Sequence, residues 1–509
     1  MHKKSVLVSV FSNWASLVLS IVIAFIVSPI LVNKLGDETY GIWVIIVSIT
    51  GYFSVLDFGV NTAIVRYISK YSALKDTHNS VAVYSTSFAL FTIIAAVVVF
   101  ATGIFALFFK DIFDIQAFSR EYLYIVFFLV GVDLAINLVF SVFMGTLKAL
   151  QRFMELNVIT MSVLIIKNVL LVYLLYHGHS LLTLAALQLI ASFVRYFLQY
   201  LLIKKNYAFL TFKVGSVSRS TLRSLYNYSI YSFMIAIATK VLFFTDSIVI
   251  GSMVSVSQVT YYAIPAMLME YLENFIWAIV SVLLPIISAR DATGDIAQNK
   301  QLYLVGTKYS LLLLSPIIVV LYLVGDDFIG LWMGENYAVP SGAVLCILLV
   351  GHTFFLAQLI AHGILKGISR HKMLAFFLCG EALVNLGLSV WLAEDYGIVG
   401  VALGTAIPLV VANVVILPIY TCSVLNIGYV SYLWTSILKP LIIPILVLVA
   451  FIYLDVQIST YLELIIFSLS FALLFGLCAF LFMLELEHKK QILQIFGKRK
   501  LKSQTTDEI

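Results

Sequence analysis

The chain has 509 residues, of which 62% are hydrophobic and only 11% charged, with a formal net charge of +5 and a mean hydropathy of +1.05. Ordinary soluble chains are about 45–50% apolar and about 25% charged, so this composition excludes a water-soluble enzyme. The apolar runs are too long and continuous for a membrane barrel, whose strands of about 10 residues alternate in polarity. The composition therefore predicts an all-α integral membrane protein.

Fourteen apolar runs are long enough to cross a bilayer as helices, which need about 20 residues each. No connecting loop exceeds about 20 residues. We therefore expect the helix bundle itself to carry the function, and we expect no enzyme activity, no metal site and no nucleic-acid partner. In chain order the predicted spans are 6–32, 40–66, 81–109, 121–146, 155–176, 181–203, 225–252, 259–288, 302–325, 340–365, 372–393, 397–422, 440–456 and 461–484.

The loop charges predict the orientation of these spans. With the N-terminus taken as cytoplasmic, only three of the 31 Lys and Arg residues fall in the outer loops and three inside spans, which leaves 25 in cytoplasmic segments. The outer loops carry acidic pairs instead, such as Asp37 and Glu38. Cytoplasmic loops of membrane proteins are enriched in Lys and Arg, so the pattern predicts that both termini are cytoplasmic.

A short motif recurs within the chain and indicates a duplication. Residues 145–152, GTLKALQR, match residues 363–370, GILKGISR, and Asn13 has a counterpart in Asn227 at a similar offset. Six spans per copy give both copies the same topology, the parallel-repeat class of transporter. We expect a first six-helix lobe at 1–205, a basic cytoplasmic linker at 206–224, a second lobe at 225–425, two further helices at 426–486 and a basic cytoplasmic tail at 487–509.

Three segments near the N-terminus suggest a family. They are residues 35–43, LGDETYGIW, then residues 56–59, LDFG, and the pair Arg66 and Tyr67. With the repeat, they make the chain resemble a Wzx-type polysaccharide flippase of the MOP exporter superfamily, along its whole length. The resemblance implies a V-shaped pair of lobes in the bacterial inner membrane. It also implies translocation of undecaprenyl-diphosphate-linked oligosaccharide units to the outer leaflet by alternating access.

Ionisable side chains deep in the spans are the candidate site residues, because such groups are expensive in lipid and normally face a cavity or a partner. Lys167, Arg195 and Lys240 lie near the bilayer midplane when depth is counted at about 1.5 Å per residue. Cations of this kind suit the diphosphate of a lipid-linked sugar. The alternative is that they neutralise neighbouring carboxylates, for example Lys167 with Asp133, and hold helices together.

Acidic groups at similar depth are candidates for ion coupling. Glu270, Glu273 and Asn274 share one helix face at i, i+3 and i+4, and Asp133 and Glu381 are further acids within spans. Two carboxylates one turn apart repel, which favours proton uptake, while carboxylate and amide oxygens could equally hold Na⁺. Buried polar packing is the alternative interpretation. We expect no cofactor beyond such a coupling ion.

A possible hinge lies in the second span. Asp57 and Asn61 share a helix face at i, i+4, and Gly59 between them permits a local bend. The hypothesis is that this span bends during alternation, and ordinary polar packing is the alternative.

Two other functions compete with the flippase. A cation-coupled multidrug exporter of the same superfamily would need an acidic or apolar cavity, and a membrane glycosyltransferase or polymerase would need larger outer loops. For the flippase we expect membrane lipid, a polysaccharide polymerase and chain-length machinery as partners, and a monomeric chain.

Overall fold

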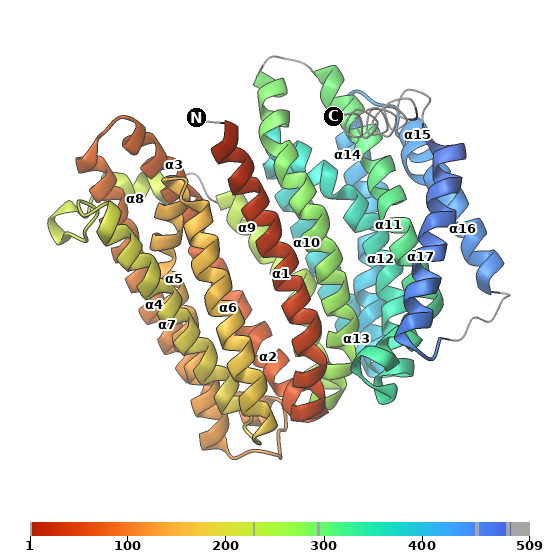
Figure 1. Cartoon of the computed structure of the whole chain (residues 1–509), viewed down its shortest axis with the longest axis horizontal. Coiled ribbons are helices and arrows are strands. Elements are labelled where there is room, and N and C mark those ends of the chain that lie inside the picture. The colour runs from red at the N-terminus through yellow and green to blue at the C-terminus, as the bar shows by residue number, and fades with distance from the viewer. Residues whose placement is uncertain (1–2, 227–229, 293–295, 453–457, 485–488, 490–509) are drawn as a thin grey trace, which may run out of the picture.

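The computed structural model describes residues 3–226, 230–292, 296–452, 458–484 and 489, and within these ranges the chain is built of helices (Figure 1). Thirteen helical segments in the described part of the chain are long and apolar enough to cross a membrane. One of them, at 371–424, has 54 residues, about 80 Å if straight, which is more than twice the roughly 30 Å of a bilayer core. Its backbone turns at Gly397, where φ is 56°. This segment thus supplies two crossings, in agreement with the fourteen predicted spans.

The first lobe contains six spans, the second of which is interrupted. Its elements are α1 Lys3–Leu35, α2 Asp37–Phe53, η1 Ser54–Asp57, α3 Val60–Ala73, α4 Thr77–Ile112, α5 Arg120–Ala149, α6 Phe153–Tyr176 and α7 Leu181–Asn206. Side-chain caps begin two of these helices. Asp76 accepts a hydrogen bond from the Asn79 amide at 3.0 Å, and Ser119 accepts one from the Tyr122 amide at 3.2 Å.

The second lobe repeats the arrangement, and two further helices follow it. Its elements are α9 Ile230–Met253, α10 Val256–Ala292, α11 Ile296–Met333, α12 Glu335–Gly367, α13 His371–Val411, η3 Ala412–Ile416 and α14 Leu417–Val424. The remaining elements are α15 Tyr429–Tyr432, η4 Leu433–Leu438, α16 Lys439–Ile452, α17 Tyr461–Cys478 and η5 Ala479–Met483, of which α16 and α17 pack on α11.

The duplicated motif has the same local structure in both lobes. Just after the end of α5, Gln151 has a φ of 59°, and the Arg152 amide donates to the Leu147 carbonyl at 2.9 Å. Just after the end of α12, Ser369 likewise has a φ of 59°, and the Arg370 amide donates to the Leu365 carbonyl at 2.8 Å. This closure satisfies carbonyls that a helix end leaves free. The internal repeat is therefore a structural one.

The two sides of the bundle differ in charge. α7 ends on one side at Lys204 and Lys205, here termed the basic side, which is at the top of Figure 1. α1 ends and α2 begins on the opposite, acidic side, where Asp37 and Glu38 form the first turn of α2. Carboxylates are favourable at that position because a helix N-terminus carries partial positive charge.

The lobes meet along α2, which packs against α9 and α10. Glycine permits this approach: a Cβ on Gly41 would lie 2.1 Å from the Val256 carbonyl oxygen, and one on Gly251 would lie 2.5 Å from Ile45. Helices in lipid associate mainly through close packing of this kind, since the lipid tails are as apolar as the side chains. The apolar core at the contact contains residues of both lobes, including Ile45, Phe109 and Ile264.

The segment predicted as the linker between the lobes lies against α4. It contains η2 Val214–Ser216 and α8 Arg219–Tyr226, and the Lys213 amide donates to Ser85 Oγ at 3.1 Å. Of the predicted tail at 487–509 only Lys489 lies within the described residues, and Asn227, one of the repeat positions, lies outside them.

Candidate functional site

A cavity of about 430 Å³ lies where the lobes meet and is here termed the central cavity. α2 forms one wall, and α9, α10, α12 and α13 form the others. The side chains facing it are aromatic, polar or ionisable to an unusual degree for a membrane interior. They include Tyr40, Trp43, Ser48, Thr239, Lys240, Phe243, Phe244, Asp246, Ser247, Tyr262, Glu270, Glu273, Asn274, His352 and Thr405.

Four of the predicted site residues meet in this cavity. Glu270, Glu273 and Asn274 all line it from α10, as their helical spacing predicts, and Lys240 lines it from α9. Lys240 Nζ lies 3.9 Å from the centroid of the Phe244 ring. Within the described ranges no ion pair joins Lys240 to either glutamate. The cavity thus holds a cation and a pair of carboxylates that are near one another without being paired.

Glu273 has further neighbours toward the basic side. Its Oε1 accepts a hydrogen bond from the Trp277 indole at 3.2 Å. Lys366, which belongs to the duplicated motif and is half-buried, holds its Nζ 4.6 Å from the centroid of the same indole. A second lysine therefore approaches this carboxylate from the basic end of α12.

Asp246 is a cavity residue that sequence reasoning missed. It is 3% exposed, and its Oδ2 accepts hydrogen bonds from Tyr262 at 2.5 Å and Thr405 at 2.9 Å. Asn385 donates in turn to Thr405 Oγ1 at 2.9 Å. No described residue hydrogen-bonds to Asp246 Oδ1. The available signal was an aspartate inside an apolar span, the criterion that selected Glu270 and Glu273.

Lys167 and Arg195 lie elsewhere, in a group within the first lobe here termed the lobe cluster. It consists of Asp133, Asn137, Lys167, Gln188 and Arg195, from α5, α6 and α7, and none of these residues lines the central cavity. Lys167 Nζ donates to Gln188 Oε1 at 3.0 Å, and Arg195 donates to Asn137 Oδ1 at 2.6 Å. Asp133 is 6% exposed and lies in the field of both cations.

Glu381 is also separate from the central cavity. It is buried in α13, accepts a hydrogen bond from Asn413 Nδ2 at 3.3 Å, and lines a largely apolar pocket of about 350 Å³ that His362 shares. His352 lines the central cavity, and its Nδ1 lies 2.9 Å from the Leu348 carbonyl oxygen, to which it donates when Nδ1 carries the proton.

The predicted hinge coincides with an interruption of the second span. α2 passes into the short η1, and then Phe58 and Gly59 take φ values of 49° and 71° before α3 begins. Asn61 Nδ2 donates to Asp57 Oδ1 at 3.2 Å and to Ser141 Oγ at 3.0 Å. The Phe58 ring lies 4.6 Å from that of Phe233 in the other lobe. The interruption thus lies at a contact between lobes.

Polar contacts join the two lobes on the acidic side, about one helical turn from the cavity residue Tyr40, and are here termed the acidic-side seal. The Asp37 carboxylate accepts hydrogen bonds from the hydroxyls of Tyr261, at 2.9 Å, and Tyr337, and the Asp37 carbonyl accepts one from Thr260 at 2.6 Å. Asn33 Nδ2 donates to the Met333 carbonyl at 2.9 Å. One turn of the first lobe therefore holds three elements of the second.

Two pseudo-repeated helical lobes, an ionisable cavity between them and polar contacts at one end define the class of fold: a polytopic, all-α membrane protein built of two similar lobes. A model of the family described as "Polysaccharide biosynthesis protein" matches residues 6–291, which is more than half of the chain. The chain belongs to this family.

Relatives and solved structures agree with that placement. The "Putative O-antigen transporter" of Shigella flexneri is 23% identical, and the match covers 77% of this chain and 93% of the relative. "Uncharacterized membrane protein EpsK" of Bacillus subtilis is 22% identical, and that match covers 96% of this chain and 97% of the relative. An inward-facing MATE family multidrug transporter of the MOP superfamily superposes with a TM-score of 0.70 at 15% identity over 80% of this chain and 94% of its own. The lipid II flippase MurJ in its inward closed conformation superposes with a TM-score of 0.68 at 15% identity, over 92% of this chain and 98% of its own. The predicted fold and family are thereby confirmed.

Proposed function

We propose that the protein moves undecaprenyl-diphosphate-linked oligosaccharide units from the inner to the outer leaflet of the bacterial cytoplasmic membrane, for assembly of surface polysaccharide. The observation that carries the proposal is an ionisable cavity between two lobes in a chain of the polysaccharide biosynthesis family. Relatives named as an O-antigen transporter and as a probable glycan biosynthesis flippase support the substrate class. The charge pattern supports cytoplasmic termini, with the basic side facing the cytoplasm.

We assign Lys240 to binding of the diphosphate group of the lipid-linked cargo. An ammonium group gives phosphate oxygens both countercharge and donors. Glu270 and Glu273 oppose the same anion when they are ionised, because like charges close together in a poorly solvated cavity repel strongly. Binding of H⁺ or Na⁺ at these carboxylates, with Asn274 as a further oxygen ligand for Na⁺, removes that opposition. Cargo and coupling ion would then bind cooperatively.

Alternating access would exchange the acidic-side seal for an opening on that side. With the acidic side facing outward, the seal would close the outer end of the cavity, and the interruption at Asp57, Gly59 and Asn61 would supply a place where the second span changes its bend. The transporter would work as a monomer. It would deliver the lipid-linked units to a polysaccharide polymerase and its chain-length machinery.

Gene deletion tests the cargo. Synthesis on the carrier lipid continues without the protein while translocation stops, so lipid-linked units should accumulate on the cytoplasmic leaflet and surface polysaccharide should disappear. Units that reach the outer leaflet normally but stay unpolymerised would contradict the proposal.

Substitutions separate cargo binding from charge pairing at Lys240. Lys240→Ala should abolish most export at normal expression, and Lys240→Ala with Glu270→Gln should stay inactive if Lys240 binds the diphosphate. Recovery of export in the double variant would instead mean that Lys240 only neutralises a glutamate. Lys205→Ala, which removes an exposed cation of the basic side, is the control.

A cation-coupled multidrug exporter is the second candidate, and the acidity of the cavity favours it. Asp246, Glu270 and Glu273 line the cavity against one lysine, which suits lipophilic cations better than an anion. Accumulation of cationic dyes in cells distinguishes the two. Increased dye retention after deletion, with surface polysaccharide intact, would replace the flippase by the exporter.

A further inference from the structure

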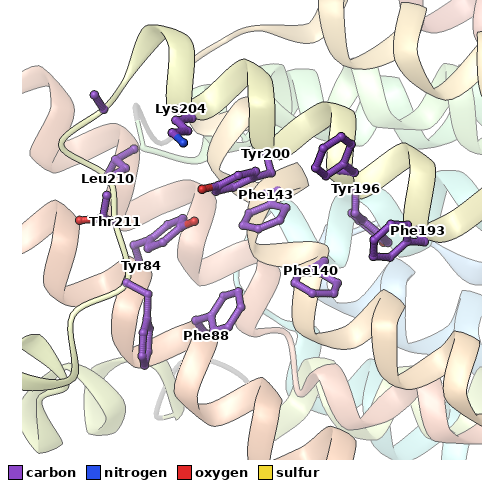
Figure 2. A pocket seen from close by; sticks show the side chains of 13 residues that line it. Tyr84, Phe88, Phe140, Phe143, Phe193, Tyr196, Tyr200, Lys204, Leu210 and Thr211 are labelled. Carbon is purple, nitrogen blue, oxygen red and sulfur yellow. The ribbon is translucent and has the colours of Figure 1, made fainter.

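A second large cavity lies on the outer surface of the first lobe and is here termed the aromatic pocket. It has a volume of about 470 Å³ and shares no residue with the central cavity. Figure 2 shows the aromatic side chains of α4, α5 and α7 gathered around it. The walls are Tyr84, Phe88, Phe140, Phe143, Phe193, Tyr196, Phe197, Tyr200, Lys204, Ala208, Leu210, Thr211 and Phe212.

The pocket runs along α7 from the membrane interior to the basic side. Phe193, Tyr196, Tyr200 and Lys204 follow one another along its length (Figure 2). The eleven helical steps from Phe193 to Lys204 correspond to roughly 16 Å. Phe193 is 57% exposed and lies in a membrane-spanning segment, so the pocket opens toward lipid.

The basic end of the pocket is formed by a segment of defined structure. After α7 the chain folds back so that Leu210, only 4% exposed, packs in the core of the first lobe. The Lys213 amide donates to Ser85 Oγ and the Ser218 amide donates to Thr86 Oγ1, both at 3.1 Å. These bonds fix the segment on α4. The pocket is therefore closed on its basic side by secured backbone, and it is more than a gap between two helices.

The charge at this end has one sign. Lys204 lines the pocket, Lys205 and Lys213 follow nearby in the chain, and none of the lining residues is acidic. Within the described residues no ion pair engages Lys204. Cations also suit the last turn of any helix, which would account for Lys204 alone. That rule does not account for the nine aromatic rings that line the same pocket, and the combination fits an amphiphile with an apolar chain and an anionic head.

We propose that the aromatic pocket binds an anionic phospholipid from the leaflet on the basic side, with one acyl chain among the rings and the phosphate at Lys204. The length supports a phospholipid. A pocket of roughly 16 Å matches half of a hydrocarbon core of about 30 Å, which is the reach of one acyl chain. A far longer polyprenyl chain has no comparable match. Basic residues at the membrane surface attract anionic lipid, which raises its local concentration at the entrance.

Tyr196 connects this lipid to the interior of the lobe. Its ring lines the pocket, and its hydroxyl donates to Asn137 Oδ1 at 3.1 Å, the same oxygen that accepts from Arg195. An acyl chain against the ring restricts the hydroxyl, and with it the position of Asn137 and Arg195. The lipid would thus order the lobe cluster without entering it.

Photo-crosslinking of the purified full-length protein tests the proposal independently of transport. The probe is phosphatidylglycerol with a diazirine at the end of one acyl chain, and phosphatidylcholine with the same chain is the comparison. Crosslinks mapped by mass spectrometry should concentrate near Phe193 and Phe140, at the deep end of the pocket. Lys204→Ala should lower the phosphatidylglycerol yield there by about fivefold, the factor that one lysine supplies near an anionic headgroup. Lys205→Ala, the matched control, should change it little.

Two further arms identify the occupant. Ala208→Trp fills the pocket near Lys204 without altering charge, and should reduce crosslinking at Phe193 for both lipids. Equal yields with phosphatidylcholine and no response to Lys204→Ala would indicate ordinary annular lipid and overturn the proposal. Displacement of phosphatidylglycerol by an equimolar polyprenyl phosphate, but not by phosphatidylcholine, would assign the pocket to the carrier lipid and also overturn it. A normal crosslinking result in a protein that exports no glycan would contradict only the proposed function.

Discussion

Removal of the Asp37 carboxylate should open the acidic-side seal. Asp37→Ala deletes the two side-chain hydrogen bonds from Tyr261 and Tyr337 and leaves the bond from Thr260, which uses the backbone carbonyl. Hydrogen bonds to charged groups contribute about 1.5–3 kcal/mol each. Asp37 is only partly buried, so water compensates for part of the loss, and we expect about 2–3 kcal/mol for the pair. Because each 1.4 kcal/mol is a factor of ten, the population open on this side should rise roughly 30- to 150-fold.

Cysteine accessibility measures this population. Ser48 lines the central cavity from α2 and is 5% exposed. In a background in which the four native cysteines are replaced, Ser48→Cys should react with an impermeant maleimide added outside intact cells at a rate that follows the open fraction. Asp37→Ala should accelerate the labelling by the factor given above.

Asp111 provides the matched control on the same side. It pairs with Arg120 at 2.8 Å within the first lobe, and its side chain is 56% exposed. Asp111→Ala should leave the labelling rate of the cysteine at position 48 unchanged. If Asp37→Ala and Asp111→Ala gave the same rate, the seal would not be held by Asp37 and the reasoning would be refuted.

Four further predictions use other parts of the chain. In intact cells an impermeant reagent should label a cysteine at Glu335 and spare one at Lys213; the opposite result would reverse the topology. Asp246→Ala should destabilise the protein by about 1–3 kcal/mol in thermal unfolding, because it leaves the buried hydroxyls of Tyr262 and Thr405 without their acceptor, whereas Asp246→Asn should be milder; equal stability of all three proteins would show that these bonds contribute nothing. Gly404→Val should prevent folding, because a Cβ there would lie 2.5 Å from the Ser389 amide nitrogen, while Gly380→Ala, where a Cβ would meet no atom of the described residues within 4 Å, should be tolerated. Hydrogen bonds from Asn79 lower the pKa of Asp76 at the start of α4. The contribution of this carboxylate to stability is therefore present above the ordinary pKa of about 3.9 and is lost as the pH falls through the lowered value. The difference in melting temperature between the parent and Asp76→Ala should accordingly shrink in acid.

The sequence predicted the elements of this protein better than their mutual positions. Span number and the repeat follow from hydropathy and from local motifs, which act within one helix. The common face of Glu270, Glu273 and Asn274 follows from helical period in the same way. Depth along a helix, however, does not say which neighbour a side chain meets. Lys167, Arg195 and Lys240 lie at similar depth, yet only Lys240 lines the central cavity.

The contacts between lobes were the least accessible from sequence. Asp37 was counted only as an outer-loop acid, and its partners Tyr261 and Tyr337 lie more than 200 residues further along the chain. Nothing local distinguishes such a carboxylate from a solvated one. The aromatic pocket was hidden for a similar reason, because Tyr and Phe near membrane interfaces are common and only the packing of α4, α5 and α7 places them around one space.

The charged side chains of the central cavity all come from one lobe, and this affects how a charged solute could cross the membrane. Lys240, Asp246, Glu270, Glu273 and His352 all belong to the second lobe, whereas α2 contributes no charged side chain to the lining. In the proposed transport cycle, a bound ion would stay beside the charged side chains of the second lobe and move together with that lobe. The electrostatic energy between the solute and these side chains would then stay nearly constant while the two lobes move relative to each other. The first lobe would open and close access to the cavity without adding charge to it. Substitutions on α2 should accordingly alter the rate of exchange between leaflets, and those on α9 and α10 the affinity.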